Sequence, residues 1–390
     1  MVLFSLPSNG ETGDVDGRFF LHIAGKHFSN QQIRNLVNVK LKLVKDRTLD
    51  SAVKGQRDLI AACILISMIS SSPLRGLPLR ALSARRKQLG LPASVRVSSF
   101  LRRYPTIFQE ELPLGSGPSF HLTPEAEELR REEETILEQH KDDLLRRLCK
   151  LLMLTGDRML PLQTIDQLRW DIGLPYGYAS SLLPNHASLF DVINPQSERV
   201  GLKLRAWDES LAISVLEKNS KSAMGGPLAF PIRFTRGYGL RKKCMAWLAE
   251  WQKLPYTSPY CDPSHLDPRT DVSEKRIVGV FHELLHLTLH KQTDRKNVSN
   301  LRKALRLPQR FTMVFERHPG IFYISRKDDT QTVVLRECFD GRTLVEKHPL
   351  VEIRERYASM MTRGFLDRSR GLYKKSVDVD VDAHVDDDVT

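Results

Sequence analysis

The chain has 390 residues, which is long enough for two or three domains. Of these residues 41% are hydrophobic and 27% charged, a composition that allows buried cores. Lys and Arg exceed Asp and Glu by 12, and the last 15 positions hold six Asp and no Lys or Arg, so the preceding 375 residues carry a net charge of +18. A body this basic favours a polyanionic partner. The longest apolar run, Leu59–Ile69, is shorter than the roughly 20 residues that span a bilayer, and we expect no membrane segment.

The two ends of the chain differ in charge from the middle. From Gly17 to Lys45 there are six Lys or Arg and no acid, and we predict an N-terminal targeting or linker segment over residues 1–44. A folded domain is expected over residues 45–360. Residues 361–390 are first basic and then acidic, which predicts a disordered tail.

An internal repeat is the most informative feature of the middle. The three copies cover about residues 59–110, 144–193 and 277–325. Each has an apolar helix candidate, then a Leu-Pro break and another helix. A short strand candidate follows, after the Tyr-Pro or His-Pro step. The strand candidates contain Phe108, Phe190 and Phe322. Units of this kind resemble helix-turn-helix or winged modules, which present basic helix surfaces.

Other elements fall between the copies. Thr123-Pro124-Glu125 predicts a helix start, because Thr is a good N-cap and Pro suits the first helical position; we expect that helix to run to about Leu154. A mixed insertion of about residues 195–270 follows the second copy, with a strand candidate at Val200–Trp207. The expected fold class is therefore α+β and predominantly helical: repeated small helical units that each end in a short strand, with this insertion between the second and third copies.

The cysteine and histidine patterns bear on whether the chain binds a metal. The five Cys are scattered without a Cys-x-x-Cys pair, which predicts buried, reduced thiols and no thiolate zinc site. His282-Glu283-x-x-His286 matches the zinc-protease helix, in which two His hold the metal and Glu activates water. Helical phase places His282, His286 and His290 opposite the apolar stripe that includes Phe281, so we predict a surface or groove-facing helix and no metal.

Basic residues concentrate inside the repeats and the insertion. Arg and Lys beside aromatic rings suit irregular RNA, because guanidinium groups pair with phosphates and rings stack on unpaired bases. We expect Trp247 and Trp251 to be core residues. The candidate RNA-binding residues are Arg80, Arg85, Arg86, Lys87, Arg102, Arg103, Tyr104, Arg241, Lys242, Lys243, Arg302, Lys303 and Arg306.

Several long blocks of this sequence resemble the plant organelle RNA recognition family over about residues 40–360. The blocks are Lys45–Val53, Leu77–Phe108, Trp247–Tyr260, Glu274–Val280, Leu307–Ile324 and Val345–Leu350. Where the family pattern reads Leu-Leu-Ser-Leu, this chain has Leu284-Leu285-His286-Leu287, which completes the zinc-like string. The resemblance implies a non-catalytic protein that is imported into mitochondria or chloroplasts, binds group II intron RNA and promotes its splicing. The stretch Asn38–Lys45 is more similar to the mitochondrial members.

Three hypotheses follow. The first is a splicing cofactor whose domain at residues 45–360 recognises organellar intron RNA, acts with other splicing factors in a ribonucleoprotein and needs no cofactor or small-molecule substrate. The second is a zinc-dependent hydrolase centred on His282, Glu283 and His286. The third is a scaffold that binds splicing proteins and touches RNA weakly.

Overall fold

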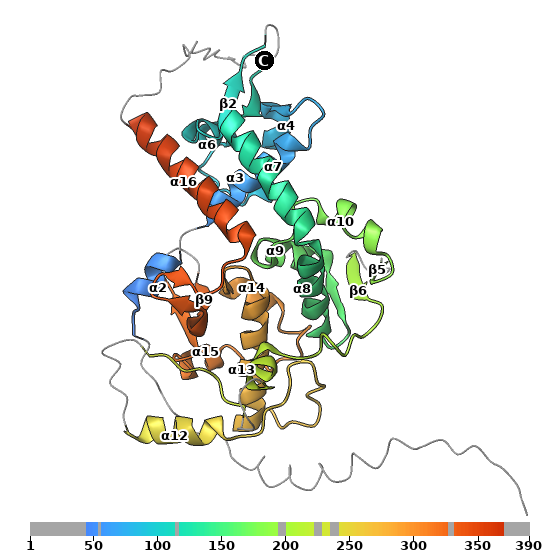
Figure 1. Cartoon of the computed structure of the whole chain (residues 1–390), viewed down its shortest axis with the longest axis vertical. Helices are drawn as coiled ribbons and strands as arrows, with labels where there is room; N and C mark the ends of the chain where they lie inside the picture. The colour runs from blue at the N-terminus through green and yellow to red at the C-terminus, as the bar shows by residue number, and fades with distance from the viewer. Residues whose placement is uncertain are drawn as a thin grey trace, which may run out of the picture.

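The computed structural model describes residues 44–53, 56–113, 117–193, 200–221, 228–234, 242–326 and 331–369. Within them, helices alternate with small antiparallel sheets, which confirms a mixed α+β fold. The described residues form three sheets of three strands each (Figure 1). In each of them the strand that comes last in the sequence lies between the other two. No helix of the described ranges is long and apolar enough to cross a membrane.

The first sheet belongs to the N-terminal segment. Its third strand lies in the middle, hydrogen-bonded to the other two, so the order is β1-β3-β2. The helices pack on this sheet through a core that includes Phe100 and Phe120. The elements are α3 (Arg57–Ser70), β1 (Gly76–Pro78), α4 (Leu79–Ala84), α5 (Arg86–Leu89), α6 (Val97–Arg103), β2 (Phe108–Glu111) and β3 (Ser119–Leu122).

The second segment also combines helices with a three-stranded antiparallel sheet. Thr123 caps α7 by accepting a hydrogen bond from the Ala126 N–H, and Pro124 is at the first helical position, as predicted. The sheet order is β4-β6-β5. The elements are α7 (Pro124–Gln139), α8 (Lys141–Met153), β4 (Met159–Pro161), α9 (Leu162–Ile172), α10 (Tyr178–Ser181), η1 (Pro184–His186), β5 (Phe190–Ile193) and β6 (Gly201–Leu204).

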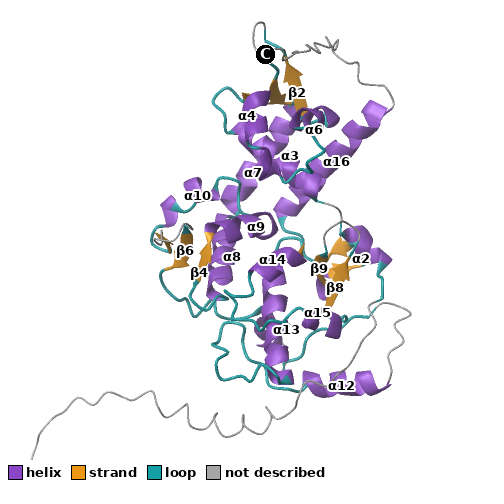
Figure 2. Cartoon of the chain, turned by 180° about the vertical axis from the view of Figure 1, so that it is seen from behind, coloured by secondary structure: helices purple, strands orange, loops and turns teal. Residues whose placement is uncertain are grey.

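The third segment follows two helices that lie between the sheets in the sequence, α11 (Val215–Lys221) and α12 (Lys242–Gln252). Its sheet has the order β7-β9-β8. The elements are α13 (Asp271–Leu287), β7 (Gln292–Asp294), α14 (Arg295–Asn300), α15 (Met313–Arg317), β8 (Phe322–Ser325), β9 (Thr332–Leu335), η2 (Arg336–Cys338), β10 (Phe339–Asp340) and β11 (Thr343–Leu344). Figure 2 shows α8, α13 and α14 between the second sheet and the third.

A backbone detail recurs in all three segments. The residue immediately before the first strand has a left-handed conformation: φ is 48° at Arg75, 54° at Arg158 and 54° at Lys291. Few non-glycine residues adopt this conformation, because the Cβ atom crowds the backbone. Its recurrence at the same place indicates that one tight helix-to-strand turn is built three times.

Each end of the described chain packs on the segment at the opposite end of the sequence. The N-terminal helix α2 (Arg47–Ala52) packs on β8 of the third sheet, and the C-terminal helix α16 (Pro349–Ser369) packs on α7 and α3 of the first core (Figure 1). The Thr106 hydroxyl donates to the Met360 carbonyl at 2.7 Å, and Tyr357 is fully buried. These contacts tie the first segment to the rest of the molecule.

The structure corrects several predictions about the extent of these elements. The helix from Thr123 is broken at His140, so α7 and α8 are separate. The strand predicted inside the insertion is β6, which completes the second sheet, and α16 extends to Ser369, so residues 361–369 are helical and not part of a disordered tail. All five cysteines are free, but Cys261 is exposed.

The helix that carries the zinc-like string is also placed differently from the prediction. It is not a surface helix: His282 and Glu283 are 2% and 0% exposed, and nearly every residue of α13 is buried. The reason is that α13 packs against α8, α11, α15 and β9 at once, so both its apolar stripe and its polar stripe are covered. Helical phase identifies the stripes, but the neighbours decide which are buried.

Candidate nucleic-acid interface

The first segment contains a long stretch without any acidic residue. Between Asp58 and Glu110 there are no Asp or Glu and eight Lys or Arg. Such a stretch presents positive charge with nothing beside it in the chain to neutralise it, which is the electrostatic requirement for a phosphate backbone. The eight residues are Arg75, Arg80, Arg85, Arg86, Lys87, Arg96, Arg102 and Arg103.

Five of these eight side chains are exposed and form no ion pair with a residue that the structure describes. Arg80 lies in α4, Lys87 in α5 and Arg85 between them; Arg75 precedes β1, and Arg96 is the N-cap of α6. Helix α4 packs directly against α6. Arg80, Arg85 and Lys87 are among the residues predicted from the sequence, but Arg75 and Arg96 are not; the absence of acids from the whole stretch is the signal that identifies them. The five define what we name the first basic surface: Arg75, Arg80, Arg85, Lys87 and Arg96.

The other basic candidates of this segment have intramolecular partners. The Arg86 guanidinium donates to the Val95 carbonyl at 2.9 Å and also to that of Pro92, so it holds the loop before α6. Arg102 donates two hydrogen bonds to Glu110, at 2.8 and 2.7 Å. Arg103 lies 3.6 Å from a carboxylate oxygen of Asp58. A phosphate would have to compete with these partners.

Tyr104 is placed differently from the prediction that it binds RNA. The residue is 6% exposed. Its ring packs edge-on against Phe100, with centroids 5.1 Å apart, and its hydroxyl donates a hydrogen bond to Asp58 at 2.8 Å. Burial and the Asp58 carboxylate raise the pKa of Tyr104 to about 12. A ring in this position is part of the core and is not accessible for stacking on an RNA base.

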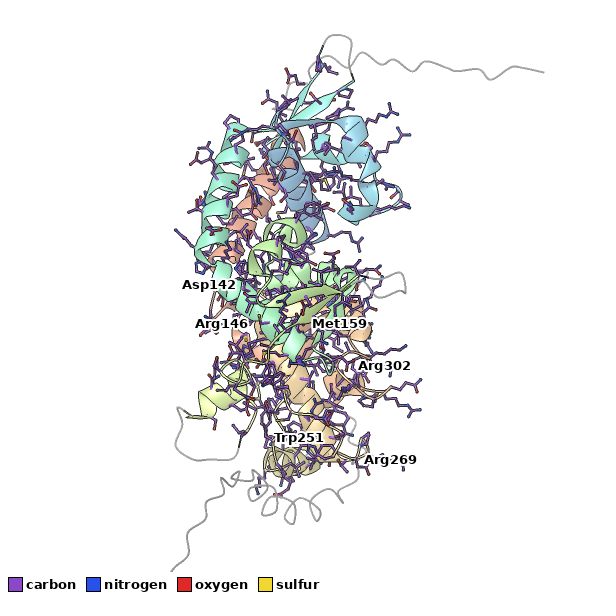
Figure 3. All side chains as sticks on the ribbon, turned by 90° about the vertical axis from the view of Figure 1, so that its right-hand side faces the viewer. Asp142, Arg146, Met159, Trp251, Arg269 and Arg302 are labelled. Atoms are coloured by element: carbon purple, nitrogen blue, oxygen red, sulfur yellow. The ribbon has the colours of Figure 1, made fainter. Side chains whose placement is uncertain are left out.

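The third segment has a second acid-free stretch, between Asp294 and Glu316. Lys303 is exposed, and Arg302 is half-buried and projects from the edge of the molecule in Figure 3. Neither forms an ion pair with a described residue. Arg306 is exposed but already paired, at 3.2 Å from Asp157 and 3.0 Å from Asp262. The second basic surface consists of Lys296, Arg302, Lys303 and Arg310, all outside such pairs within the described ranges.

Arg306 also has a backbone role. Its φ of 52° is left-handed, and it stands before Leu-Pro where the first and second segments have Gly90 and Gly173, with φ of 65° and 86°. Glycine is the usual residue at such a helix end. The ion pairs of Arg306 hold the strained turn, so this side chain is better explained by structure than by RNA contact.

The second segment carries acids where the others carry bases. Asp171, in α9, accepts a hydrogen bond from the Thr293 hydroxyl at 2.6 Å and thereby joins α9 to β7. Trp170, in the same helix, stacks against Arg354 at 3.6 Å and donates to Gln56 at 2.7 Å. The corresponding stretch of the second segment is thus used for contacts within the molecule.

The insertion contributes fewer described basic side chains than the first and third segments. Arg241 lies outside the described residues. Lys242 is exposed at the start of α12, and Lys243 follows it in the helix. Trp251 is 1% exposed and packs 4.3 Å from His318, which confirms that it is a core residue, and Trp247 packs 6.3 Å from Trp251 and is partly buried.

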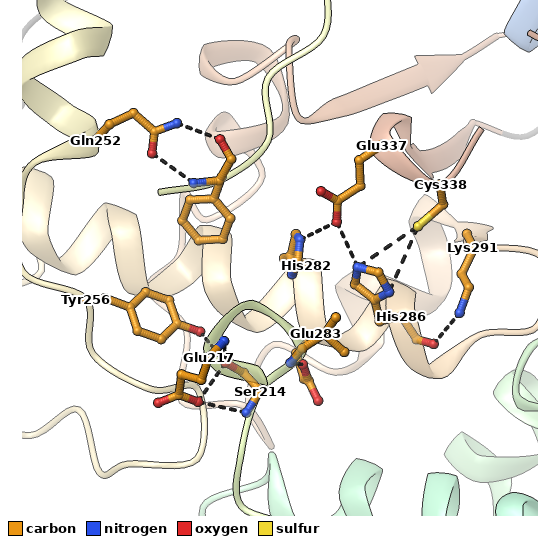
Figure 4. A network of polar contacts seen from close by, with 12 residues as sticks. Ser214, Glu217, Gln252, Tyr256, His282, Glu283, His286, Lys291, Glu337 and Cys338 are labelled. Carbon is orange, nitrogen blue, oxygen red and sulfur yellow. Dashed lines mark hydrogen bonds and ion pairs between the residues drawn. The ribbon is translucent and has the colours of Figure 1, made fainter. Parts of the chain in front are cut away.

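The zinc-like string is arranged unlike a hydrolase site. Glu283, which would have to activate water, is fully buried; it lies 2.6 Å from the Lys150 ammonium and accepts hydrogen bonds from the Tyr260 hydroxyl and the Val215 N–H, each at 2.7 Å. Burial raises the pKa of Glu283, but the Lys150 charge and these hydrogen bonds outweigh burial and lower it. The two histidines point to a different carboxylate, that of Glu337 (Figure 4). This geometry therefore does not support the hydrolase hypothesis. Glu283, the acid that would activate water, is bonded to Lys150, whereas the two histidines are bonded to Glu337.

Comparison with known proteins gives one family. The family model described as plant organelle RNA recognition domain matches residues 44–366. "Protein WHAT'S THIS FACTOR 9, mitochondrial" of Arabidopsis thaliana is 36% identical over 90% of this chain and 94% of its own length. "Protein WHAT'S THIS FACTOR 1, chloroplastic" of Zea mays is 29% identical over 82% of this chain and 67% of its own, and "Protein ROOT PRIMORDIUM DEFECTIVE 1" of Arabidopsis thaliana is 28% identical over 82% of each. No solved structure matches the chain.

Proposed function

Because the chain belongs to the plant organelle RNA recognition family, we propose that it is a non-catalytic RNA-binding protein that binds organellar group II intron RNA and promotes its splicing. The observation that carries the proposal is the pair of acid-free basic stretches, Asp58 to Glu110 and Asp294 to Glu316, which contain the two basic surfaces. The residues of these surfaces form no ion pair with a residue that the structure describes. We further propose that both basic surfaces contact the phosphates of one RNA and that other splicing factors join it in a ribonucleoprotein.

The three segments support a repeated winged-module architecture as part of this proposal. Each has a helix, a left-handed turn residue, a first strand, a helical stretch and two more strands, with the last strand central. In winged modules, helices beside such a sheet present basic side chains to nucleic acid. The first and third copies would then bind RNA, while the acids of α9 make the second a connector.

Location in mitochondria is proposed on two grounds. The relative with 36% identity is named mitochondrial, and the basic segment before residue 45 is compatible with import. Chloroplast import is the alternative, since other relatives are named chloroplastic. Fusing residues 1–44 to a fluorescent protein in plant cells tests this: mitochondrial fluorescence supports the proposal, and chloroplast fluorescence selects the alternative.

RNA binding is tested with the purified chain, a group II intron RNA and an unrelated structured RNA of equal length, over a series of salt concentrations. We expect preference for the intron and a steep loss of affinity with salt, because each neutralised phosphate releases counterions. Changing Arg80, Arg85 and Lys87 together to Gln should reduce the slope of log affinity against log salt by about 2.1–2.7, at about 0.7–0.9 per phosphate contact.

The matched control removes three positive charges elsewhere. Arg131, Arg205 and Lys253 are all exposed, and each is ion-paired with a neighbouring carboxylate. Their triple change to Gln should leave the salt slope nearly unchanged. An equal loss in both variants would show that only net charge matters; no binding of either RNA by the native chain would favour the scaffold hypothesis.

A further inference from the structure

Two histidines and a glutamate converge on one point in the third segment. Nε2 of His282 lies 2.6 Å from Oε1 of Glu337, and Nε2 of His286 lies 2.8 Å from the same oxygen (Figure 4). The two imidazole rings are one helical turn apart on α13, with centroids 4.6 Å apart. One potential ligand atom from each of the three residues falls within 4.8 Å of the others.

The elements that carry this cluster hold it in place. His282 and His286 come from a helix that is buried along nearly all its length, and Glu337 comes from η2, directly after the central strand β9. The neighbouring Arg336 is fixed by an ion pair with Asp46 at 2.8 Å and by a hydrogen bond to the Pro319 carbonyl at 2.7 Å, so η2 is anchored next to Glu337. The ligand atoms therefore belong to two rigid elements and not to a loop.

The chemistry of the three groups is that of a zinc site. Two imidazoles and one carboxylate are a common ligand set for Zn²⁺, at about 2.0–2.2 Å from the ion. Such distances put tetrahedral ligand atoms about 3.4 Å apart. The two Glu337–histidine separations, 2.6 and 2.8 Å, are shorter than this, so an ion requires the Glu337 carboxylate to withdraw by less than about 1 Å. The two histidine nitrogens, which lie within 4.8 Å of each other, must move closer together.

Burial also favours an ion at this point. His282 is 2% exposed at its side chain, and His286 and Glu337 are each 14% exposed, so water screens the carboxylate poorly. A buried carboxylate is costly unless it is paired or coordinates a metal. Lys291 is nearby, but its ammonium donates to the His286 carbonyl at 2.8 Å, and the Cys338 sulfur borders the cluster at 3.9 Å from Nδ1 of His286.

We propose that His282, His286 and Glu337 form a zinc-binding site that joins α13 to η2 and stabilises the third segment. The site is structural, because Glu283, the acid that hydrolysis would need, is held by Lys150 in the other network. It is independent of the RNA-binding proposal, and neither proposal requires the other.

The experiment uses the full chain with Cys261 changed to Ser, which removes an exposed thiol that could bind zinc adventitiously. The protein is stripped with a chelator, and Zn²⁺ binding is measured by titration calorimetry, by metal content after dialysis and by the shift in thermal midpoint. We expect one zinc ion per chain and a rise in the midpoint, because an ion that binds the folded state alone stabilises it.

Two variants and one control locate the site. Glu337→Gln keeps a hydrogen-bond acceptor for both histidines but weakens zinc binding; His286→Ala removes a ligand. Loss of even an outer partner of a ligand costs about tenfold or more in affinity, so each variant should lose at least that much. His265→Ala, at an exposed histidine outside the cluster, should bind zinc like the parent. Native-like circular dichroism of the Gln variant shows that the fold survives.

The outcomes are distinct. Stoichiometric zinc that is lost in both variants and kept in His265→Ala supports the site. Absence of zinc binding and of any midpoint shift in the parent protein overturns it, and so does zinc that Glu337→Gln binds as tightly as the parent. In either of those cases the three residues are a hydrogen-bonded network only.

Discussion

Asp46 and Arg336 are 290 positions apart in the sequence, yet a carboxylate oxygen of Asp46 lies 2.8 Å from the Arg336 guanidinium in a buried ion pair. Asp46 also caps α2, accepting from the backbone N–H groups of Thr48 and Leu49. The pair fixes the N-terminal helix on the third sheet, while α16 returns to the first core. Segments at opposite ends of the chain are thereby coupled.

Changing Asp46 to Ala should destabilise the protein by about 3–5 kcal/mol, because it leaves a buried guanidinium unpaired and also removes a helix cap. Chemical denaturation measures the change in unfolding free energy. Lys45→Ala is the control: Lys45 is 77% exposed and 4.0 Å from Asp50, so its removal should cost less than about 1 kcal/mol. Equal effects of the two changes would contradict the importance of the buried pair.

The Lys150–Glu283 pair makes a similar test between α8 and α13. Lys150→Ala leaves Glu283 buried without its cation and should cost about 3–5 kcal/mol of stability. The exposed pair of Lys253 with Glu250, at 2.9 Å, provides the comparison: Lys253→Ala should cost less than about 1 kcal/mol. If Lys150→Ala proved harmless, Glu283 would have to be neutral or free to move, and its assignment to a structural network would be wrong.

Asp171 should make stability depend on pH. Burial, with the nearby Asp294 charge, raises the pKa of Asp171 from 3.8 to about 7, although hydrogen bonds from Thr293 and Asn297 and the Arg354 charge oppose the rise. Because the folded-state pKa is the higher one, this group contributes most to stability below about pH 4, and that contribution falls as pH rises to about 7, by up to about 1.4 kcal/mol per pH unit.

Asp171→Asn keeps the acceptor oxygen and removes the titration, so its thermal midpoint should vary less between pH 4 and 8 than that of the native chain. Asp166→Asn, at an exposed position of the same helix, is the control and should leave the pH profile unchanged. An unaltered profile in Asp171→Asn would show that Asp171 does not titrate in this range.

Gly90 tests the left-handed helix end of the first segment. An added Cβ at Gly90 or at Gly117 meets no atom within 4 Å, but only Gly90 has a positive φ, of 65°. Gly90→Ala should therefore cost about 1–2 kcal/mol through backbone strain alone. Gly117→Ala should cost nothing of this kind, and a comparable loss at both positions would argue against the strain explanation. Thermal or chemical denaturation of the two variants decides.

The second basic surface predicts unequal effects of neighbouring arginines on RNA binding, on the basis of the proposed function. Changing Arg302 and Lys303 together to Gln should lower the salt slope of RNA affinity by about 1.4, at about 0.7 for each single-strand phosphate. Arg306→Gln should change the slope little, because the Arg306 guanidinium is already ion-paired with Asp157 and Asp262. A larger effect from Arg306→Gln would mean that RNA displaces those carboxylates.

Local features of this chain could be predicted because they depend on neighbouring residues. The N-cap and proline at Thr123-Pro124 start α7 as expected, and strands begin at Phe108, Phe190 and Phe322, where the proline and turn residues ended the preceding helical stretches. The excess of basic residues and their grouping along the chain were equally visible. Charge and capping act within one or two helical turns, so the order of residues suffices to find them.

Which side chains are buried, and which residues they contact, depends on the tertiary structure. The phase of α13 correctly separates its apolar and polar stripes, but only the packing of α8, α11, α15 and β9 around it shows that His282 is buried. Likewise, Arg85 and Arg86 are adjacent and chemically identical, yet one is exposed and the other holds a loop. The order of residues specifies which positions carry charge and where several helices and strands begin. Which of these residues meet a partner depends on the fold, because the contacts of His286 with Glu337 and of Asp46 with Arg336 join residues far apart in the chain. No local pattern specifies such pairs.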